Sequence, residues 1–152
     1  MTQSVYFILC YPLYVEYTLI LIHFTISGGI TYHAALDINF GLEYLTLNPN
    51  KCQELHAILK GLQLVIIDEV SMVGADRLYD ISRRLMEIMK VFKDPFGGVA
   101  IMLVGDLMQL PPVRAAPIFT KPKSDKNVTQ WAAPKTNLWE SNQVVVLKTN
   151  FR

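Results

Sequence analysis

The chain has no Lys or Arg in its first third. None of its 14 Lys and Arg residues occurs before Lys51, whereas three of its 13 acidic residues, Glu16, Asp37 and Glu43, do. The first fifty residues therefore carry a charge of −3 and the remainder +4, although the net charge is only +1. Lys and Arg usually keep the surface of a domain hydrated. We therefore expect this first third to be largely buried, or not to be the start of an ordinary domain.

Cysteines and histidines are also scarce. The two cysteines, Cys10 and Cys52, form no Cys-x-x-Cys pair, which excludes a disulfide scaffold and favours a reducing, intracellular setting. The three histidines lack the spacing of a zinc site. With 51% hydrophobic and 18% charged residues, the 152-residue chain has enough apolar material for one folded domain, which excludes a disordered or low-complexity protein.

One apolar run, Val5 to Ile26, has the length of a membrane span. Pro12, Glu16 and His23 interrupt it, and no Lys or Arg precedes it to orient insertion or to begin a signal peptide. The β-branched and aromatic residues of Thr18 to Ile26 favour a buried parallel strand. We therefore expect a strand and no stable membrane association, with a small membrane-anchored protein as the alternative.

From Gln53 onward, predicted strands and helices alternate. Leu62 to Asp68 and Val99 to Val104 are aliphatic runs typical of strands covered on both faces. Asp94 to Gly98 contains a Pro and two Gly and predicts a turn before the second strand. With a crossover helix between them, the two strands predict a right-handed parallel unit. Val144 to Leu147 predicts a third strand.

The crossover helix is predicted over Asp76 to Phe92. Its apolar positions, spaced by three and four residues, are Leu78, Ile81, Leu85, Ile88 and Phe92. Charged residues, Arg84 and Glu87 among them, mostly fall elsewhere on the helical wheel. The later stretch Arg114 to Lys135 is rich in Pro, Lys, Ser and Asn and predicts a solvated loop. The pattern as a whole predicts an α/β fold.

Acidic residues follow both predicted parallel strands. Asp68 and Glu69 follow the first strand, and Gly105-Asp106 follows the second. Ligands of open parallel sheets bind at the carboxyl ends of the strands. An aliphatic strand that ends in Asp-Glu suits a nucleotide hydrolase, with Asp68 to hold Mg²⁺ and Glu69 to polarise the attacking water. The alternative is that these acids cap the next helix.

Four motifs occur in a fixed order along the chain. They are Asp68-Glu-Val-Ser-Met72, Pro95-Phe-Gly-Gly98, Gly105-Asp-Leu-Met-Gln-Leu-Pro-Pro-Val113 and Leu147-Lys-Thr-Asn-Phe-Arg152. With them, the chain from about Gly28 to its last residue resembles the petite-integration-frequency family of DNA helicases, a branch of superfamily one that includes the helicase part of Helitron transposon proteins. The resemblance implies a RecA-like P-loop NTPase domain, with a parallel sheet flanked by helices, that hydrolyses ATP with Mg²⁺ to unwind DNA from 5′ to 3′.

The resemblance also implies roles for individual residues. Asp68 would be the Walker B magnesium ligand and Glu69 the catalytic base. Gln109 would sense the γ-phosphate and couple it to DNA, while Gly105 and Asp106 would shape the same nucleotide-binding loop. Without the resemblance, Gln109 is interpreted as an exposed loop amide.

Two further assignments follow from the same resemblance. Arg152 would reach the triphosphate, its alternative being a frayed terminus. The segment Gly28 to Leu36 resembles the part of the family that touches single-stranded DNA, so that Thr31 and His33 would contact phosphate or base and Tyr32 would offer a stacking face. The alternative for His33 is packing on, or capping, the following helix. The resemblance implies single-stranded or forked DNA as the partner. It also implies roles in repair, recombination and telomere maintenance, and a location in the nucleus or else the mitochondrion.

One motif of the family is lacking. The phosphate loop G-x-x-x-x-G-K-[ST] requires a Gly followed by Lys, and the sequence has no such pair. We therefore expect residues 1–27 to be an atypical apolar segment and residues 28–152 to be part of the first RecA-like helicase domain, without a second domain, and we expect the isolated chain to lack ATPase and unwinding activity. The alternative function is a non-hydrolysing remnant that binds single-stranded DNA. It would use Gly28 to His33 and the basic residues Arg114, Lys121, Lys123 and Lys126.

Overall fold

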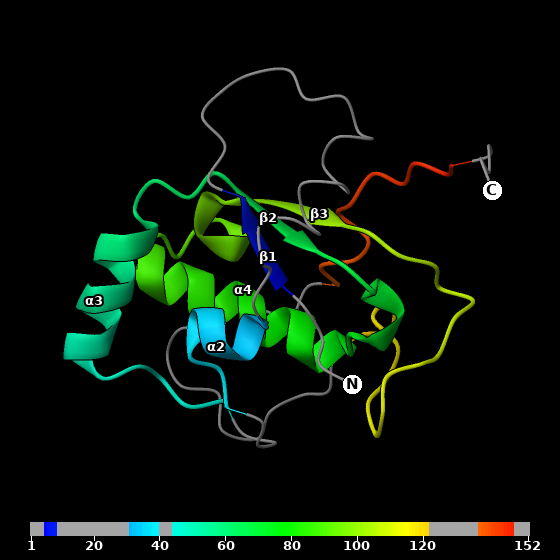
Figure 1. The fold of residues 1–152 in the computed structure, drawn as a ribbon, viewed down its shortest axis with the longest axis horizontal. Helices are drawn as coiled ribbons and strands as arrows, with labels where there is room; N and C mark the ends of the chain where they lie inside the picture. The colour runs from blue at the N-terminus through cyan, green and yellow to red at the C-terminus, as the bar shows by residue number, and fades with distance from the viewer. Residues whose placement is uncertain (1–4, 9–30, 40–43, 122–136, 148–152) are drawn as a thin grey trace.

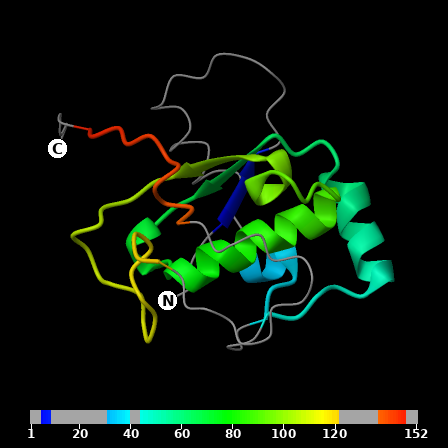
Figure 2. The same ribbon diagram turned by 180° about the vertical axis from the view of Figure 1, so that it is seen from behind.

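The computed structural model describes residues 5–8, 31–39, 44–121 and 137–147. In chain order, the elements are β1 (Val5–Ile8), α2 (Tyr32–Leu36), α3 (Pro49–Leu59), β2 (Leu64–Ile67), the 3₁₀ turn η1 (Val70–Met72), α4 (Ala75–Met89), the 3₁₀ turn η2 (Pro95–Gly98) and β3 (Ala100–Leu103). Figures 1 and 2 show α4 running along one face of the sheet, with α2 beside it and α3 near one of its ends. The described residues form an α/β fold, as the sequence predicts.

The sheet has the strand order β1-β2-β3. Strands β2 and β3 are parallel, with Leu64 opposite Ala100 and Ile67 opposite Leu103, and this confirms the predicted parallel pair. Strand β1 is antiparallel to β2, so the described sheet is mixed and not wholly parallel. Parallel sheets often carry an antiparallel strand at an edge.

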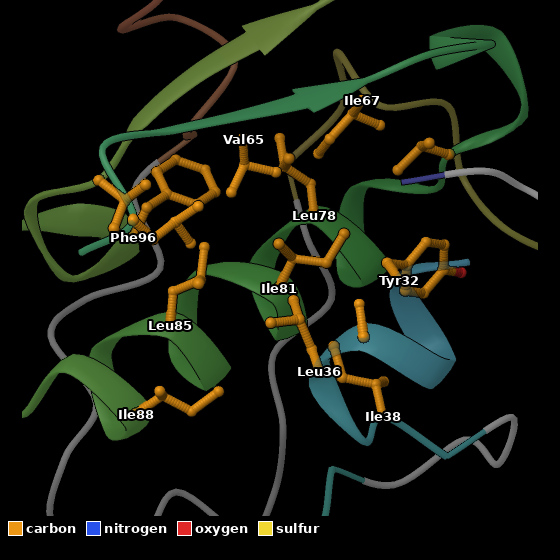
Figure 3. Packing of buried hydrophobic residues seen from close by; sticks show 14 of the residues in the cluster. Tyr32, Leu36, Ile38, Val65, Ile67, Leu78, Ile81, Leu85, Ile88 and Phe96 are labelled. Atoms are coloured by element: carbon orange, nitrogen blue, oxygen red, sulfur yellow. The ribbon is translucent and has the colours of Figure 1, made fainter. Parts of the chain in front are cut away.

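The core lies between β2 and α4. Figure 3 shows Val65 and Ile67 of β2 facing the side chains of Leu78, Ile81 and Leu85 of α4. Because side chains alternate along a strand, Ile66 lies on the opposite face of the sheet, and it too is fully buried. Strand β2 is therefore covered on both faces, as its aliphatic run predicts.

Helix α4 is shorter than the sequence predicts. It ends at Met89, where Lys90 adopts a left-handed backbone (φ 60°) whose N–H donates to the Met86 carbonyl. Phe92 therefore lies beyond the helix and is exposed, so its predicted place on the apolar face of the helix is wrong. The predicted turn before β3 is confirmed as η2, in which Phe96 is buried.

Two other predictions need correction. Val144 to Leu147 forms no strand, and its four side chains are 71–83% exposed. Part of the expected solvated loop is packed, because Pro117 bridges to Gly74 and Ile118 is buried beside the start of α4. The strand expected over Thr18 to Ile26 lies outside the described residues.

Helix α3 was not predicted, although its start carries recognisable signals. The side chain of Asn48 accepts the N–H of Lys51 at 2.7 Å, and Pro49 occupies the first helical position. Both features favour helix initiation. Among the helices of the described ranges, none has the length and apolar character that crossing a bilayer would require.

Candidate functional site

The predicted catalytic acids lie where the parallel strands β2 and β3 end. The Val104 N–H donates to the Ile67 carbonyl at 2.8 Å, and the Val70 N–H donates to the Val104 carbonyl at 3.0 Å. These two main-chain bonds hold the turn after β2 against the turn after β3. We call residues 68–70 and 104–109 the carboxylate rim.

In the first turn of the rim, the backbone reverses at Glu69. This residue has a left-handed conformation (φ 52°, ψ 47°), and its N–H donates to Asp68 Oδ1 at 2.8 Å. Asp68 is half-buried, whereas Glu69 is exposed. Glu69 is the N-cap residue of the short η1, but its side chain makes no capping hydrogen bond there. Helix α4 begins only at Ala75 with Gly74 as its N-cap, so neither acid caps α4.

The second turn of the rim is closed by Asp106. Its Oδ1 accepts the Met108 N–H at 2.9 Å, and its carbonyl accepts the Gln109 N–H at 3.1 Å. The side chain of Gln109 is exposed. The parallel register therefore places the loop with Asp106 and Gln109 beside the Asp68–Glu69 turn.

The donor chemistry of the rim suits Mg²⁺. Carboxylate oxygens are ligands that this ion prefers, and it is usually held by one or two carboxylates while water and phosphate complete its shell. Asp68 supplies such a group, with Oδ1 engaged by a main-chain N–H. Over the described ranges, no cluster of three or more His, Cys, Asp or Glu side chains could enclose a metal. The carboxylate of Asp68 therefore fits the donor set of an ion that is also bound by phosphate and water.

The predicted DNA-contacting residues begin α2. Thr31 is the N-cap, and its side chain accepts the Ala34 N–H at 3.3 Å. Tyr32 is only 2% exposed, and burial raises the pKa of its hydroxyl to about 12. A stacking role would therefore require this ring to leave the core, where Figure 3 shows it among the other buried hydrophobic residues.

His33 packs at the same helix. Its ring centroid lies 3.9 Å from that of Tyr32. Burial, assisted by the positive charge of Arg77, lowers the pKa of His33 to about 4. The imidazole is therefore neutral at physiological pH, which favours the packing alternative over a cationic contact to phosphate.

A second polar cluster joins α4 to the chain between α2 and α3. Arg84 is 2% exposed, and it donates to the carbonyls of Asp37 (3.2 Å) and Leu45 (2.8 Å) and to Glu87 Oε2 (2.9 Å). Glu87 in turn accepts the Tyr44 hydroxyl at 2.8 Å. We call this cluster, together with the Leu47 N–H that donates to Glu87 Oε1, the helix junction.

The helix junction was not found from the sequence. Helical periodicity assigns Arg84 and Glu87 to the polar face. Nothing in the spacing shows that this face is contacted by Asp37, Tyr44, Leu45 and Leu47. Of the other predicted site residues, Arg114 and Lys121 are exposed. Arg152, Lys123 and Lys126 lie outside the described residues.

Comparisons with known proteins place this chain in a family. The sequence profile of the PIF1-like helicases matches residues 21–152. The ATP-dependent DNA helicase RRM3 of Saccharomyces cerevisiae is 31% identical over 82% of this chain and 17% of its own length. The ATP-dependent DNA helicase PIF1 of Homo sapiens is 36% identical over 57% of this chain and 14% of its own length.

A solved structure also matches part of the fold. A structure that addresses DNA unwinding at forked double-stranded DNA by two coordinating Pif1 helicases is 40% identical, with a TM-score of 0.50. The match covers 57% of this chain and 21% of that chain. The 152 residues thus span about a fifth or less of these relatives.

Proposed function

Because the chain belongs to the PIF1-like helicase family, we propose that it supplies the magnesium-binding and water-activating residues of an ATP-dependent DNA helicase. The observation that carries the proposal is the parallel register of β2 and β3, which brings the Asp68–Glu69 turn against the Gly105–Gln109 loop. In this family such motifs serve one nucleotide site, and here they share one edge of the sheet.

Three residues of the rim have distinct tasks in the proposed reaction. Asp68 would hold Mg²⁺, which when bound neutralises charge on the β- and γ-phosphates. The exposed carboxylate of Glu69 would accept a proton from the attacking water. Gln109, on the loop closed by Asp106, would report the presence of the γ-phosphate.

The proposed macromolecular ligand is DNA, single-stranded or forked. The names of the matched relatives support this, as does the structure concerned with forked DNA. In this chain, Thr31 and the exposed Arg114 and Lys121 are available for phosphate contacts. Roles in repair, recombination and telomere maintenance, and a nuclear or mitochondrial location, are proposed on the family resemblance alone.

We further propose that the 152 residues alone do not hydrolyse ATP. Phosphoryl transfer in P-loop proteins needs a lysine from the phosphate loop, and the sequence contains no Gly-Lys pair. The measurement is phosphate release with and without single-stranded DNA, for the wild type and for Glu69→Gln. Background hydrolysis in both proteins is expected, whereas a DNA-stimulated activity that Glu69→Gln abolishes would refute this part of the proposal.

The magnesium site can be tested without turnover. Mn²⁺, a paramagnetic substitute for Mg²⁺, is titrated into the ¹⁵N-labelled chain in the presence of ATP. Broadening of the amide signals at the rim is expected in the wild type and is lost in Asp68→Asn, which keeps the shape of the side chain but removes its charge. Lys51→Gln, remote from the rim, serves as the control. Equal broadening in the wild type and Asp68→Asn would remove the assigned metal ligand.

A further inference from the structure

Gly105 begins the second turn of the rim and lies so close to the backbone of the first turn that no side chain would fit between them. A Cβ atom at this position would lie 2.8 Å from the Val70 nitrogen, 3.2 Å from Val70 Cγ1 and 3.4 Å from the Glu69 carbonyl carbon. Non-bonded heavy atoms seldom approach to 2.8 Å, and a backbone nitrogen cannot swing aside as a side chain can. In addition, Gly105 has φ +142°, a conformation that side-chain-bearing residues rarely adopt.

The backbone that Gly105 touches is the part that fixes Glu69. The Val70 N–H is bound to the Val104 carbonyl at 3.0 Å, and the Glu69 N–H is bound to Asp68 Oδ1 at 2.8 Å. Between these two bonds, Glu69 holds its left-handed conformation. A non-glycine residue in that region costs free energy unless the surroundings impose it. The close approach of Gly105 is what allows the bond from Val70 to Val104 to form.

We infer that Gly105 is a positioning residue for Glu69. Its missing side chain lets the turn after β3 close on the Glu69–Val70 peptide, and this contact keeps Glu69 in the left-handed conformation. The inference deepens the proposed function and rests on it, because the position of Glu69 matters only if that carboxylate activates water. The geometric part of the inference, however, can be measured on its own.

A second consequence concerns the loop that carries Asp106 and Gln109. This loop begins at Gly105, so a displacement of the loop acts directly on the Val70 N–H and on the turn at Glu69. A group bound at Gln109 and a water activated by Glu69 are therefore linked through one main-chain contact. No side chain of either residue needs to touch the other.

The experiment compares Gly105→Ala with Gly98→Ala in the ¹⁵N-labelled full chain. Gly98 also has a positive φ (+78°), but a Cβ there meets nothing within 4 Å, so it controls for backbone strain without the steric contact. Hydrogen exchange is measured at the Val70 amide, with amides in the centre of α4 as an internal reference. The Glu69 amide shift is recorded as the spectroscopic signature of its backbone conformation.

Gly105→Ala is expected to accelerate exchange at Val70 by about tenfold or more and to shift the Glu69 signal, while the α4 amides keep their rates. Gly98→Ala is expected to leave Val70 and Glu69 unchanged. Unchanged exchange at Val70 in Gly105→Ala, or equal acceleration in both variants, would overturn the inference.

Two further measurements keep the test decisive. If Gly105→Ala does not fold, the wild type alone is informative, because a Val70 amide that exchanges as fast as the exposed amides of the rim would refute the close contact. If the wild type shows no Mn²⁺ broadening with ATP, the proposed function fails. The exchange rates at Val70 still decide whether Gly105 sets the conformation of Glu69.

Discussion

The carboxylate rim and the helix junction are both rich in charged residues, but they are held in opposite ways. At the junction, side chains make the contacts: Arg84 is buried, and its guanidinium binds two carbonyls and Glu87. At the rim, main-chain groups make the principal contacts, and the carboxylate of Glu69 remains exposed. The backbone positioning suits the role proposed for Glu69, because its carboxylate stays available. Charges that fasten two segments together have no such requirement.

The largest expected effect comes from breaking the junction. Arg84→Met leaves the Asp37 and Leu45 carbonyls and the Glu87 carboxylate without their buried partner. We expect the free energy of unfolding in urea to fall by about 3 kcal/mol, since removal of one member of a buried ion pair strands the other.

Lys51→Met is the matched control for Arg84→Met. Lys51 pairs with Glu54 on the surface, where the two side chains are 36% and 58% exposed, so its loss should change stability by less than about 0.5 kcal/mol. A loss below about 1 kcal/mol for Arg84→Met would show that the junction is no stronger than a surface pair.

A smaller effect is expected at the tyrosine of the junction. Tyr44→Phe removes the hydrogen bond from the hydroxyl to Glu87 and should cost about 1 kcal/mol near pH 7. Burial raises the pKa of Tyr44 above its usual range. The unfolded chain therefore loses this proton first, and stability falls as the pH rises above about 10.

The free energy of unfolding, measured as a function of pH, shows whether Tyr44→Phe removes a titrating group. A simple loss of packing would lower stability equally at every pH and leave the slope above about pH 10, the alkaline limb of the curve, unchanged. Tyr32, whose pKa is also raised, contributes to this limb in both proteins, so the limb should become shallower in the variant without disappearing. Identical alkaline limbs in the wild type and the variant would contradict the assigned burial of the Tyr44 hydroxyl.

A smaller change still is expected at His33, which the structure places beside α4 residue Arg77. Because the pKa of His33 is lowered to about 4, the unfolded chain takes up a proton first as the pH falls below about 6.5. Stability is therefore lost between about pH 6.5 and 4, and His33→Gln should flatten this part of the curve. The ring is half-buried, so the effect should stay below about 1 kcal/mol. An acid limb of unchanged slope would show that His33 titrates alike in both states.

The smallest effect on stability is expected at the rim. Glu69→Gln keeps the shape of an exposed side chain, and the free energy of unfolding should change by no more than about 0.5 kcal/mol. Chemical denaturation of the two proteins side by side measures this difference. A loss above about 1 kcal/mol would mean that the Glu69 carboxylate is itself a structural contact, and the contrast between rim and junction would not hold.

The elements that could be predicted from the sequence are those whose contacts are near in the chain. Strand β2, helix α4, turn η2 and strand β3 follow one another with short connections, and periodicity with turn residues predicts each of them. The neighbouring positions of Asp68 and Asp106 also follow, because parallel strands that adjoin in sequence end at one edge.

Features set by distant segments could not be predicted. Arg84 has a polar position on the helical wheel, yet it is buried and bound to the Asp37 and Leu45 carbonyls, and no local pattern encodes those contacts. Tyr32 is similar, because an aromatic residue at a helix start suits a stacking surface and a core equally well. Val144 to Leu147 shows the converse, since a strand-forming composition makes no strand without a neighbour to pair with.

The turn η2 bears on the order in which the chain folds. Its Phe96 N–H donates to Ser82 Oγ of α4 at 2.9 Å. The two residues are only fourteen positions apart in the chain, so this contact closes a short loop. Loops of this length close quickly and at little entropic cost. We expect residues 64–104 to assemble first, with the bonds from Arg84 to the Asp37 and Leu45 carbonyls forming afterwards. The two main-chain bonds that join the turns of the rim, from Val104 to Ile67 and from Val70 to Val104, lie within this first unit and need nothing from the segment that begins at Thr31.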